Sequence, residues 1–282
     1  MKNSTFFRNT FLAATVALFS SAMISCDNIA DDDRYFEVES ITPVRSILIE
    51  DFTGQNCVNC PEAHAVIESL EEQYGDNVVA VSIHAGGFSR PKSRTNFAVG
   101  RVYLGTDEGT YYNDQNSVNA WPFGIINGGA GTDVYSSWAA LAKSMLTMPS
   151  NLNIGGSAHV NGNSVDISLE LVSEEDINGQ LMVWIIESGI VAEQKLPDGS
   201  TNSEYVHNNV FRAPVNDIDG EAVSLEKDMP LRKSYSIELR DNNQEKWVPE
   251  NLAIVAFLRT PSGVEQVKKV KVQILEEFLK RL

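Results

Sequence analysis

The spacing of apolar side chains changes near residue 150, and the two parts of the chain predict different elements. In the first part, two dense apolar runs at residues 45–52 and 77–85 predict buried strands. Between these runs, apolar side chains recur at the spacing of one helix face: Ala63, Val66, Ile67, Leu70 and Tyr74. Pro61 is expected to begin this helix and Gly75 to end it. A strand, a helix and a strand in this order predict a parallel crossover unit.

The remainder of the first part predicts fewer regular elements. Residues 86–120 are rich in Gly, Ser, Asn and Asp, which indicates an excursion from the sheet, with a short helix near residues 95–105. Residues 120–129 then predict a short strand that follows a Trp-Pro step. Residues 133–148 predict an amphipathic helix that Pro149 ends.

From residue 151 onward, apolar and polar side chains alternate with a step of two, the pattern of half-buried strands. Asn161-Gly162 and the Pro-Ser-Gly at residues 261–263 are typical of hairpin turns. Seven or eight strands with no helix between them predict an all-β, immunoglobulin-like antiparallel sandwich. We therefore expect an α/β domain over residues 44–149, followed by a β-sandwich domain over residues 150–282.

The first 43 residues have the pattern of an export segment and a tether. Lys2 and Arg8 precede an apolar stretch at residues 11–19, and small residues follow up to Cys26, as in a secretory signal. The stretch before Cys26 resembles the lipobox of bacterial lipoproteins. This resemblance implies a signal peptide over residues 1–25, with acylation of the sulfur and of the new amino group of Cys26. Residues 26–43 are acidic and predict a solvated tether. The alternative is a plain signal peptide with an incidental cysteine.

Composition excludes some partners. The 282 residues are 43% hydrophobic and 21% charged, which is ordinary for a globular protein, and their formal net charge is -16. Nucleic-acid binding needs clustered Lys and Arg, so we expect no nucleic-acid partner. The glycine pairs lack the spacing of a phosphate-binding loop, and we expect no cofactor.

Cys57 and Cys60 form a CxxC pair between the first predicted strand and the helix that follows it. The thioredoxin fold places its redox pair at this position. Unpaired N–H groups and the dipole at a helix N-terminus favour a thiolate, which is the species that attacks a disulfide. We expect Cys57 to be the exposed nucleophile and Cys60 to be the half-covered resolving cysteine. The Trp121-Pro122 step resembles the cis-proline loop of thioredoxin-like proteins. This implies that Pro122 faces the pair and shapes the groove where a partner's backbone docks.

The strings "LIEDFTGQNCVNCPEAH" and "YVHNNVFRA" resemble the Omp28-related outer membrane lipoproteins of Bacteroidetes. The resemblance implies a thioredoxin-like domain and a β-sandwich, anchored to the outer membrane through Cys26 and facing the periplasm or the cell surface. It also implies protein thiols or disulfides as partners of a possible thiol-disulfide oxidoreductase. That family is described mainly as surface antigens or adhesins. Unlike the pair of classical thioredoxin, Cys57 and Cys60 have no Trp before them and no Gly-Pro between them. The likeness to thioredoxin therefore does not set the direction of electron flow.

Three other interpretations of the pair stay open. Cys57, Cys60 and His64 could bind a soft metal ion, with His84 as a fourth ligand. The pair could be a passive disulfide in an oxidising compartment, although so short a loop is a poor structural staple. The protein could also be an outer-membrane or cell-surface binding or adhesion lipoprotein with a vestigial pair.

Polar residues elsewhere are weaker candidates for a functional role. Glu50 and Asp51 precede the CxxC, and only one of them can face the helix layer, where a carboxylate could accept a proton. His207, with Tyr205 and Arg212, could line a ligand surface of the sandwich, or these could be ordinary polar residues at a strand end.

Overall fold

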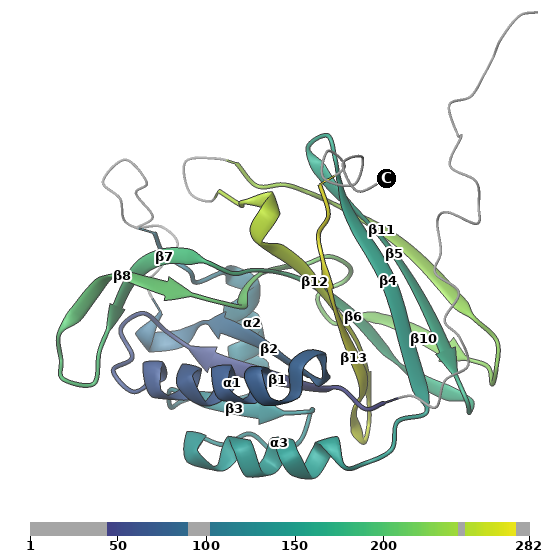
Figure 1. The fold of residues 1–282 in the computed structure, drawn as a ribbon, viewed down its shortest axis with the longest axis horizontal. Helices are drawn as coiled ribbons and strands as arrows, with labels where there is room; N and C mark the ends of the chain where they lie inside the picture. Colours follow the sequence, from purple (N-terminus) through teal and green to yellow (C-terminus); the bar gives the residue numbers. More distant parts are fainter. Residues whose placement is uncertain (1–43, 90–101, 242–245, 275–282) are drawn as a thin grey trace, which may run out of the picture. The chain divides into compact units, whose positions relative to one another are not determined.

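The computed structural model describes residues 44–89, 102–241 and 246–274, all of which belong to one compact unit. The predicted signal peptide, the tether and Cys26 lie outside the described residues. The fold is mixed α/β and consists mostly of strands (Figure 1). None of the described helices is both long enough and apolar enough to span a membrane.

The predicted crossover unit is confirmed. It consists of β1 (Ile47–Thr53), α1 (Cys60–Tyr74) and β2 (Val78–His84). β1 and β2 pair in parallel from Ile47↔Val78 to Thr53↔His84, and every residue of both strands is buried. Burial on both faces explains why these strands appear in the sequence as continuous apolar runs and not as alternating ones.

Two further helices and one strand complete this half of the fold. They are α2 (Asp107–Gln115), β3 (Phe123–Ile126) and α3 (Trp138–Leu146). β3 pairs antiparallel with the free side of β1, and the Trp121–Pro122 peptide bond before it is cis. The prediction of a helix near residues 95–105 is wrong for the described part of that range, because residues 102–105 have no regular secondary structure. The helix begins only after Thr106, whose hydroxyl accepts a hydrogen bond from the Gly109 N–H (2.9 Å).

α1 and α3 cover the same face of β1 and β2. Their apolar side chains form one core cluster with alternate residues of the two strands, which include Ile49 and Ala80. On the opposite face, Tyr112 of α2 packs into a second cluster with Leu48 and the other alternate residues. The three helices therefore sandwich this part of the sheet.

The second half consists of strands, as the alternation predicts. Ten strands are described: β4 (Leu152–Asn161), β5 (Ser164–Ser173), β6 (Ile177–Glu187), β7 (Ile190–Lys195), β8 (Thr201–His207), β9 (Val210–Pro214), β10 (Glu221–Leu225), β11 (Leu231–Glu238), β12 (Leu252–Thr260) and β13 (Gly263–Lys271). The hairpin predicted at Asn161-Gly162 joins β4 to β5, and Gly162 has a φ of 59°, a conformation that suits glycine.

The large sheet runs across the boundary predicted at residue 150. Its order is β13-β12-β6-β9-β2-β1-β3, with β10 also paired to β6. β9 makes the connection, because it pairs antiparallel with β6 and, through Ser82↔Val210, parallel with β2. The two predicted domains thus share one sheet. The three-stranded sheet β11-β5-β4 and part of the large sheet contribute side chains to a common apolar core.

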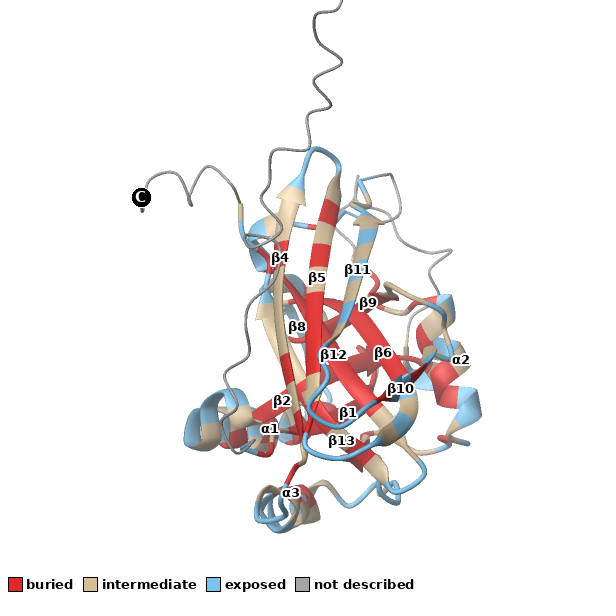
Figure 2. Ribbon diagram, turned by 90° about the vertical axis from the view of Figure 1, so that its right-hand side faces the viewer, coloured by how far each residue is buried: buried red, intermediate tan, exposed pale blue. Residues whose placement is uncertain are grey.

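The large sheet also curls, so that its β13 end lies against β1. The Ser46 N–H donates to Gln266 Oε1 (2.8 Å), and the Val264 N–H donates to the Asn127 carbonyl (3.0 Å). The curl encloses an aromatic cluster in which Trp184 contacts Phe211 and Phe257 edge to face. Figure 2 shows buried residues along β5, β6 and β12, and β1 and β2 are buried over their whole length.

Candidate functional site

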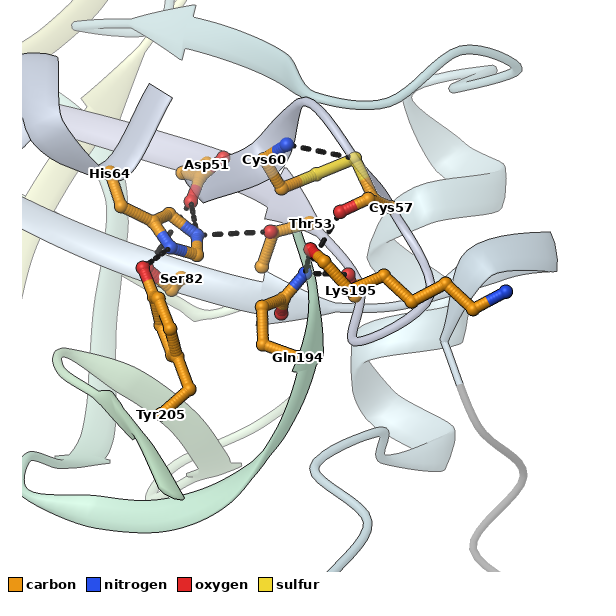
Figure 3. The surroundings of a disulfide bond; sticks show 10 residues. Asp51, Thr53, Cys57, Cys60, His64, Ser82, Gln194, Lys195 and Tyr205 are labelled. Carbon is orange, nitrogen blue, oxygen red and sulfur yellow. Dashed lines mark hydrogen bonds and ion pairs between the residues drawn. A yellow bond between two sulfur atoms is a disulfide. The ribbon is translucent and has the colours of Figure 1, made fainter. Parts of the chain in front are cut away.

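The CxxC pair lies where β1 passes to α1, as predicted. Cys57 and Cys60 form a disulfide, with their Cα atoms 5.5 Å apart (Figure 3). Cys60 is the first residue of α1, and its backbone N–H donates to Cys57 Sγ (3.1 Å). The sulfur of Cys57 therefore receives one of the N–H groups that a helix leaves free at its first turn.

The prediction that Cys57 is exposed is wrong. Its exposed fraction is 2%, and that of Cys60 is 0%. The hairpin of β7 and β8 holds the loop, because Gln194 Nε2 donates to the carbonyl oxygens of Cys57 (2.8 Å) and Gly54 (3.3 Å). The Lys195 N–H donates to the Gln55 carbonyl (2.9 Å). The second half of the chain thus contributes directly to the CxxC loop.

The Gln55 side chain ties the same loop to two more segments. Its amide Nε2 donates to the carbonyls of Val102 and Glu193 (3.0 Å each), and its Oε1 accepts from the Leu104 N–H (3.2 Å). Sequence reasoning missed both Gln55 and Gln194. Gln55 lies within the string around the CxxC pair but was given no role, and the Gln194 contact to Cys57 spans 137 residues, so no local pattern could have indicated it.

Residues 86–88 and Trp121 lie on another side of the loop. The Asn56 N–H donates to the Phe88 carbonyl (3.0 Å), and the Phe88 ring lies edge-on to Trp121, with 5.4 Å between ring centroids. Pro122 follows Trp121, and Phe123 pairs with Phe52 in the sheet. This register brings Pro122 to the end of β1, the end from which the CxxC loop departs.

Asp51 is the carboxylate that faces the helix layer. It is fully buried, and its Oδ2 lies 3.4 Å from His64 Nε2 and accepts from the Ser82 hydroxyl (3.2 Å). His64 Nε2 also lies 3.1 Å from Thr53 Oγ1, and His64 Nδ1 lies 2.9 Å from the Tyr205 hydroxyl of β8. Burial raises the pKa of Tyr205 to about 12, so its hydroxyl keeps its proton and can donate to Nδ1. This leaves the Nε2 proton for Asp51 and Thr53.

Glu50 lies on the other face of β1, as the alternation of a strand requires. It is 2% exposed, and its Oε1 accepts from Arg259 (2.8 Å). Burial raises the pKa of the Glu50 carboxyl, and the Arg259 guanidinium opposes that shift. Of the two candidate carboxylates, only Asp51 belongs to the site.

The predicted metal set is not assembled. The described residues contain no group of three or more His, Cys, Asp or Glu side chains placed to hold a metal ion. Cys57 and Cys60 are bonded to each other, and both ring nitrogens of His64 have polar partners. The hypothesis that the thiolates of Cys57 and Cys60 bind a metal ion is therefore wrong for the protein in its oxidised form.

The three residues suggested for a ligand surface separate into two environments. Arg212 is buried and pairs with Glu187, at 3.3 Å between Nε and Oε2. His207 is buried beside Tyr205, with 4.8 Å between ring centroids, and beside His84 at 5.2 Å. Tyr205 and His207 thus lie close to the CxxC helix, which the sequence did not indicate.

Among solved structures, HBP35 of Porphyromonas gingivalis has the same fold. It is 11% identical, with a TM-score of 0.60 over 81% of this chain and 75% of that one. Protein AGR_C_4864 from Agrobacterium tumefaciens is 17% identical over 81% of this chain and 95% of that one, with a TM-score of 0.45. A domain of the outer membrane lipoprotein Omp28 from Porphyromonas gingivalis is 20% identical over 44% and 90%, with a TM-score of 0.32. No curated protein sequence matches this chain.

A family model described as outer membrane protein Omp28 matches residues 109–275. The match runs from α2 to the end of the described strands, which is more than half of the chain, and it does not include the CxxC pair. It confirms the outer-membrane location that the family resemblance implied. The chain belongs to the family of the outer membrane protein Omp28.

Proposed function

We propose that this protein is an outer-membrane lipoprotein that exchanges thiols and disulfides through Cys57 and Cys60. The observation that carries the proposal is the hydrogen bond from the Cys60 N–H to Cys57 Sγ at the start of α1 (3.1 Å). After reduction, this N–H and the helix dipole would stabilise a Cys57 thiolate. The order of β2-β1-β3, with α1 and α3 on one face, supports a thioredoxin-like assignment for this half.

The exchange involves two steps, in each of which a thiolate attacks a disulfide, one S–S bond forms and another breaks. The Cys57 thiolate attacks a partner disulfide, a Cys57–partner bond forms, and one partner sulfur leaves as a thiolate. Cys60 then attacks the Cys57 sulfur, which re-forms the Cys57–Cys60 bond and releases the second partner thiolate. The pair loses two electrons and the partner gains them; the reverse sequence oxidises a partner dithiol.

Cys60 must lose its proton before it attacks, and it is fully buried. His64 lies one helical turn after Cys60 on the same helix, and its imidazole is held by Asp51, Thr53 and Tyr205. We assign Asp51 the role of proton acceptor for Cys60, and His64, whose two ring nitrogens are already engaged, the role of positioning the Asp51 carboxylate. Pro122, at the end of β1, would line the groove in which a partner's backbone docks.

Because Cys57 is 2% exposed, a partner has to displace the segments that lie against its loop. These are residues 86–88 on one side and the β7–β8 hairpin on another. The same burial favours the alternative in which the disulfide is passive and the protein is a surface binding or adhesion lipoprotein. The two functions are separated by the reactivity of the reduced pair.

The test is the alkylation rate of Cys57 in the reduced full chain across about pH 5 to 9. We would compare the Cys60→Ser variant, which keeps Cys57, with the matched Cys57→Ser variant, and identify the modified cysteine by peptide mass spectrometry. We expect Cys57 to titrate clearly below the value of about 8.5 of a free thiol, and Cys60 not to do so. Alkylation of Cys57 at the rate of a model thiol would reject the exchange function and favour the passive disulfide.

Membrane attachment is tested at Cys26. Each buried CH₂ of an acyl chain contributes about 0.8 kcal/mol, so two or more chains anchor a protein stably. We expect the Cys26→Ser variant to leave the membrane fraction and to lack the acyl mass at the mature N-terminus. Retention of the variant in the membrane fraction would contradict a lipid anchor at this residue.

A further inference from the structure

The β7–β8 hairpin holds the backbone of the CxxC loop through three of its carbonyl groups. Gln194 Nε2 donates to the carbonyl oxygens of Cys57 (2.8 Å) and Gly54 (3.3 Å), and the Lys195 N–H donates to that of Gln55 (2.9 Å). Figure 3 shows the Gln194 side chain reaching the Cys57 carbonyl. These contacts keep the loop in the position in which Cys57 is buried.

The outer half of this hairpin has little packing to hold it in place. Residues 195–204 are all exposed except the half-buried Leu196, and among the described strands β7 and β8 pair only with each other. The inner half is different, because Ala192 packs into a small buried cluster with Leu104 and Val210. A segment with few buried apolar contacts opens locally at a lower free energy than the core does.

The two halves of the hairpin meet at a bulge. The register shifts between Ala192, which pairs with Tyr205, and Gln194, which pairs with Asn202. A bulge interrupts the ladder of hydrogen bonds and bends the strands, and Figure 1 shows both strands curving along their length. On the inner side of the bulge, the Tyr205 hydroxyl contacts His64 (2.9 Å), whereas Gln194 on the outer side contacts the loop. The hairpin can therefore bend at the bulge and release the loop while its contact with α1 persists.

Withdrawal of Gln194 leaves no carbonyl of the loop buried without a partner. The Gly54 carbonyl also accepts from the Cys57 N–H (3.0 Å), and solvent can reach the Cys57 carbonyl once the outer half has moved. The Gln55 amide donates to Glu193 within the bulge (3.0 Å), so this bond does not oppose the movement of the outer half. Opening then exchanges a few hydrogen bonds for bonds to water, which costs much less than global unfolding.

We propose that the outer half of the β7–β8 hairpin is a clamp that controls access to the Cys57–Cys60 disulfide, with Gln194 as the residue that closes it. With the clamp closed, Cys57 is 2% exposed. When the outer half bends away, the loop loses its three carbonyl contacts and Cys57 becomes accessible to a reductant or a partner. Gln194 is a positioning residue, because it acts on the backbone of the loop. The regulation of exchange rests on the proposed function, whereas the opening of the clamp does not.

The test is the rate at which a water-soluble phosphine reduces the disulfide in the oxidised full chain. The phosphine attacks one sulfur, the S–S bond breaks, and water converts the phosphorus adduct to phosphine oxide while both cysteines become thiols. Alkylation and peptide mass spectrometry follow Cys57 and Cys60 separately from Cys26. Gln194→Met keeps most of the side-chain volume but lacks the amide donors. We expect its disulfide to be reduced at least about tenfold faster than that of the wild type.

Gln266→Met is the matched control. Gln266 is also buried, and its Nε2 donates to two carbonyls, those of Val44 (3.1 Å) and Leu152 (3.0 Å), near the end of β1 that is opposite to the CxxC loop. This variant should lose stability but keep the reduction rate of the wild type. Equal acceleration in the two variants, or none in Gln194→Met, would overturn the proposal.

Hydrogen exchange of the wild type tests the clamp without any variant. The Lys195 N–H, which donates to the Gln55 carbonyl, should open at a free energy below that of global unfolding, whereas the amides of β12 should open only globally. Global opening of Lys195 would overturn the proposal. The outcome is distinct from that of the alkylation test. Faster reduction of Gln194→Met, together with a Cys57 that titrates like a model thiol, would support the clamp and reject the exchange function.

Discussion

The two faces of β1 carry neighbouring carboxylates with different surroundings. Glu50 and Asp51 are both buried, and one oxygen of each has no hydrogen-bond partner within the described structure. Glu50 accepts from Arg259, which is always charged, whereas Asp51 contacts His64 and the Ser82 hydroxyl. The first carboxylate has a partner whose charge is fixed, and the second has a partner that can itself gain or lose a proton.

This difference separates a structural ion pair from a candidate proton acceptor on a single strand. Burial and residue type do not distinguish the two carboxylates; only their partners do. The comparison can be tested, because each side of β1 can be altered without changing the other.

The largest expected effect is on the Asp51 side. Asp51→Asn should slow the Cys60 step of disulfide exchange about a hundredfold at pH 7, because it removes the proton acceptor. Stopped-flow measurement of mixed-disulfide resolution gives this rate. Glu50→Gln is the matched control and should leave the rate unchanged. Equal slowing in the two variants would contradict the division between the faces.

The second-largest expected effect is a loss of folding stability on substitution of Arg259. Arg259→Met leaves Glu50 buried without its cation and should lower the free energy of unfolding by about 2 kcal/mol. The loss is smaller than for a fully buried pair, since the Arg259 side chain is 34% exposed. Urea unfolding of the single variants and of the Glu50→Gln/Arg259→Met double variant measures the coupling. Additive losses would show that the pair has no net interaction.

A smaller effect is expected where β8 meets the site. Tyr205→Phe removes the hydroxyl that lies 2.9 Å from His64 Nδ1 and should cost about 1 kcal/mol in unfolding free energy. It should also alter the pH profile of mixed-disulfide resolution by Cys60, because His64, which positions Asp51, loses the contact that favours one tautomer. An unchanged profile would place Tyr205 outside the proton-accepting group.

The smallest effect concerns pH and Glu50. Since burial raises the folded-state pKa of Glu50, the folded protein holds this proton more tightly than the unfolded chain does. The associated stability is present below the unfolded pKa of about 4.5 and is lost as pH rises through the folded value. The stability of the wild type relative to Glu50→Gln should therefore be greater at pH 4 than at pH 7. The opposite sign in acid and neutral urea titrations would show that Arg259 outweighs desolvation.

The spacing of apolar and turn residues correctly predicted several strands, one helix and one hairpin, because these elements depend on residues close together in the chain. The apolar runs around Ile49 and Ala80, the helix from Cys60 and the Asn161-Gly162 hairpin all lie where their spacing indicated. The position of the CxxC pair followed from these elements. The cis bond before Pro122 agrees with the resemblance of the Trp121-Pro122 step to the cis-proline loop of thioredoxin-like proteins.

The partners of these elements could not be predicted in the same way. An alternating run indicates a strand but does not identify its neighbour, and the two halves join through Ser82↔Val210, residues far apart in the chain. The exposure of Cys57 was mispredicted for the same reason, because Gln194 comes from a hairpin with no sequence link to the pair. Sequence reasoning also could not place His207 beside His84.

The pairing of β9 with β2 has a consequence for evolution and for protein engineering. A fragment that ended at residue 149 would leave β2 as an open sheet edge, and such edges promote aggregation. It would also lack Gln194 and Tyr205. The cysteine pair and the strand-rich segment therefore depend on each other structurally, and recombination between them would have to replace both a strand neighbour and a buried amide at once.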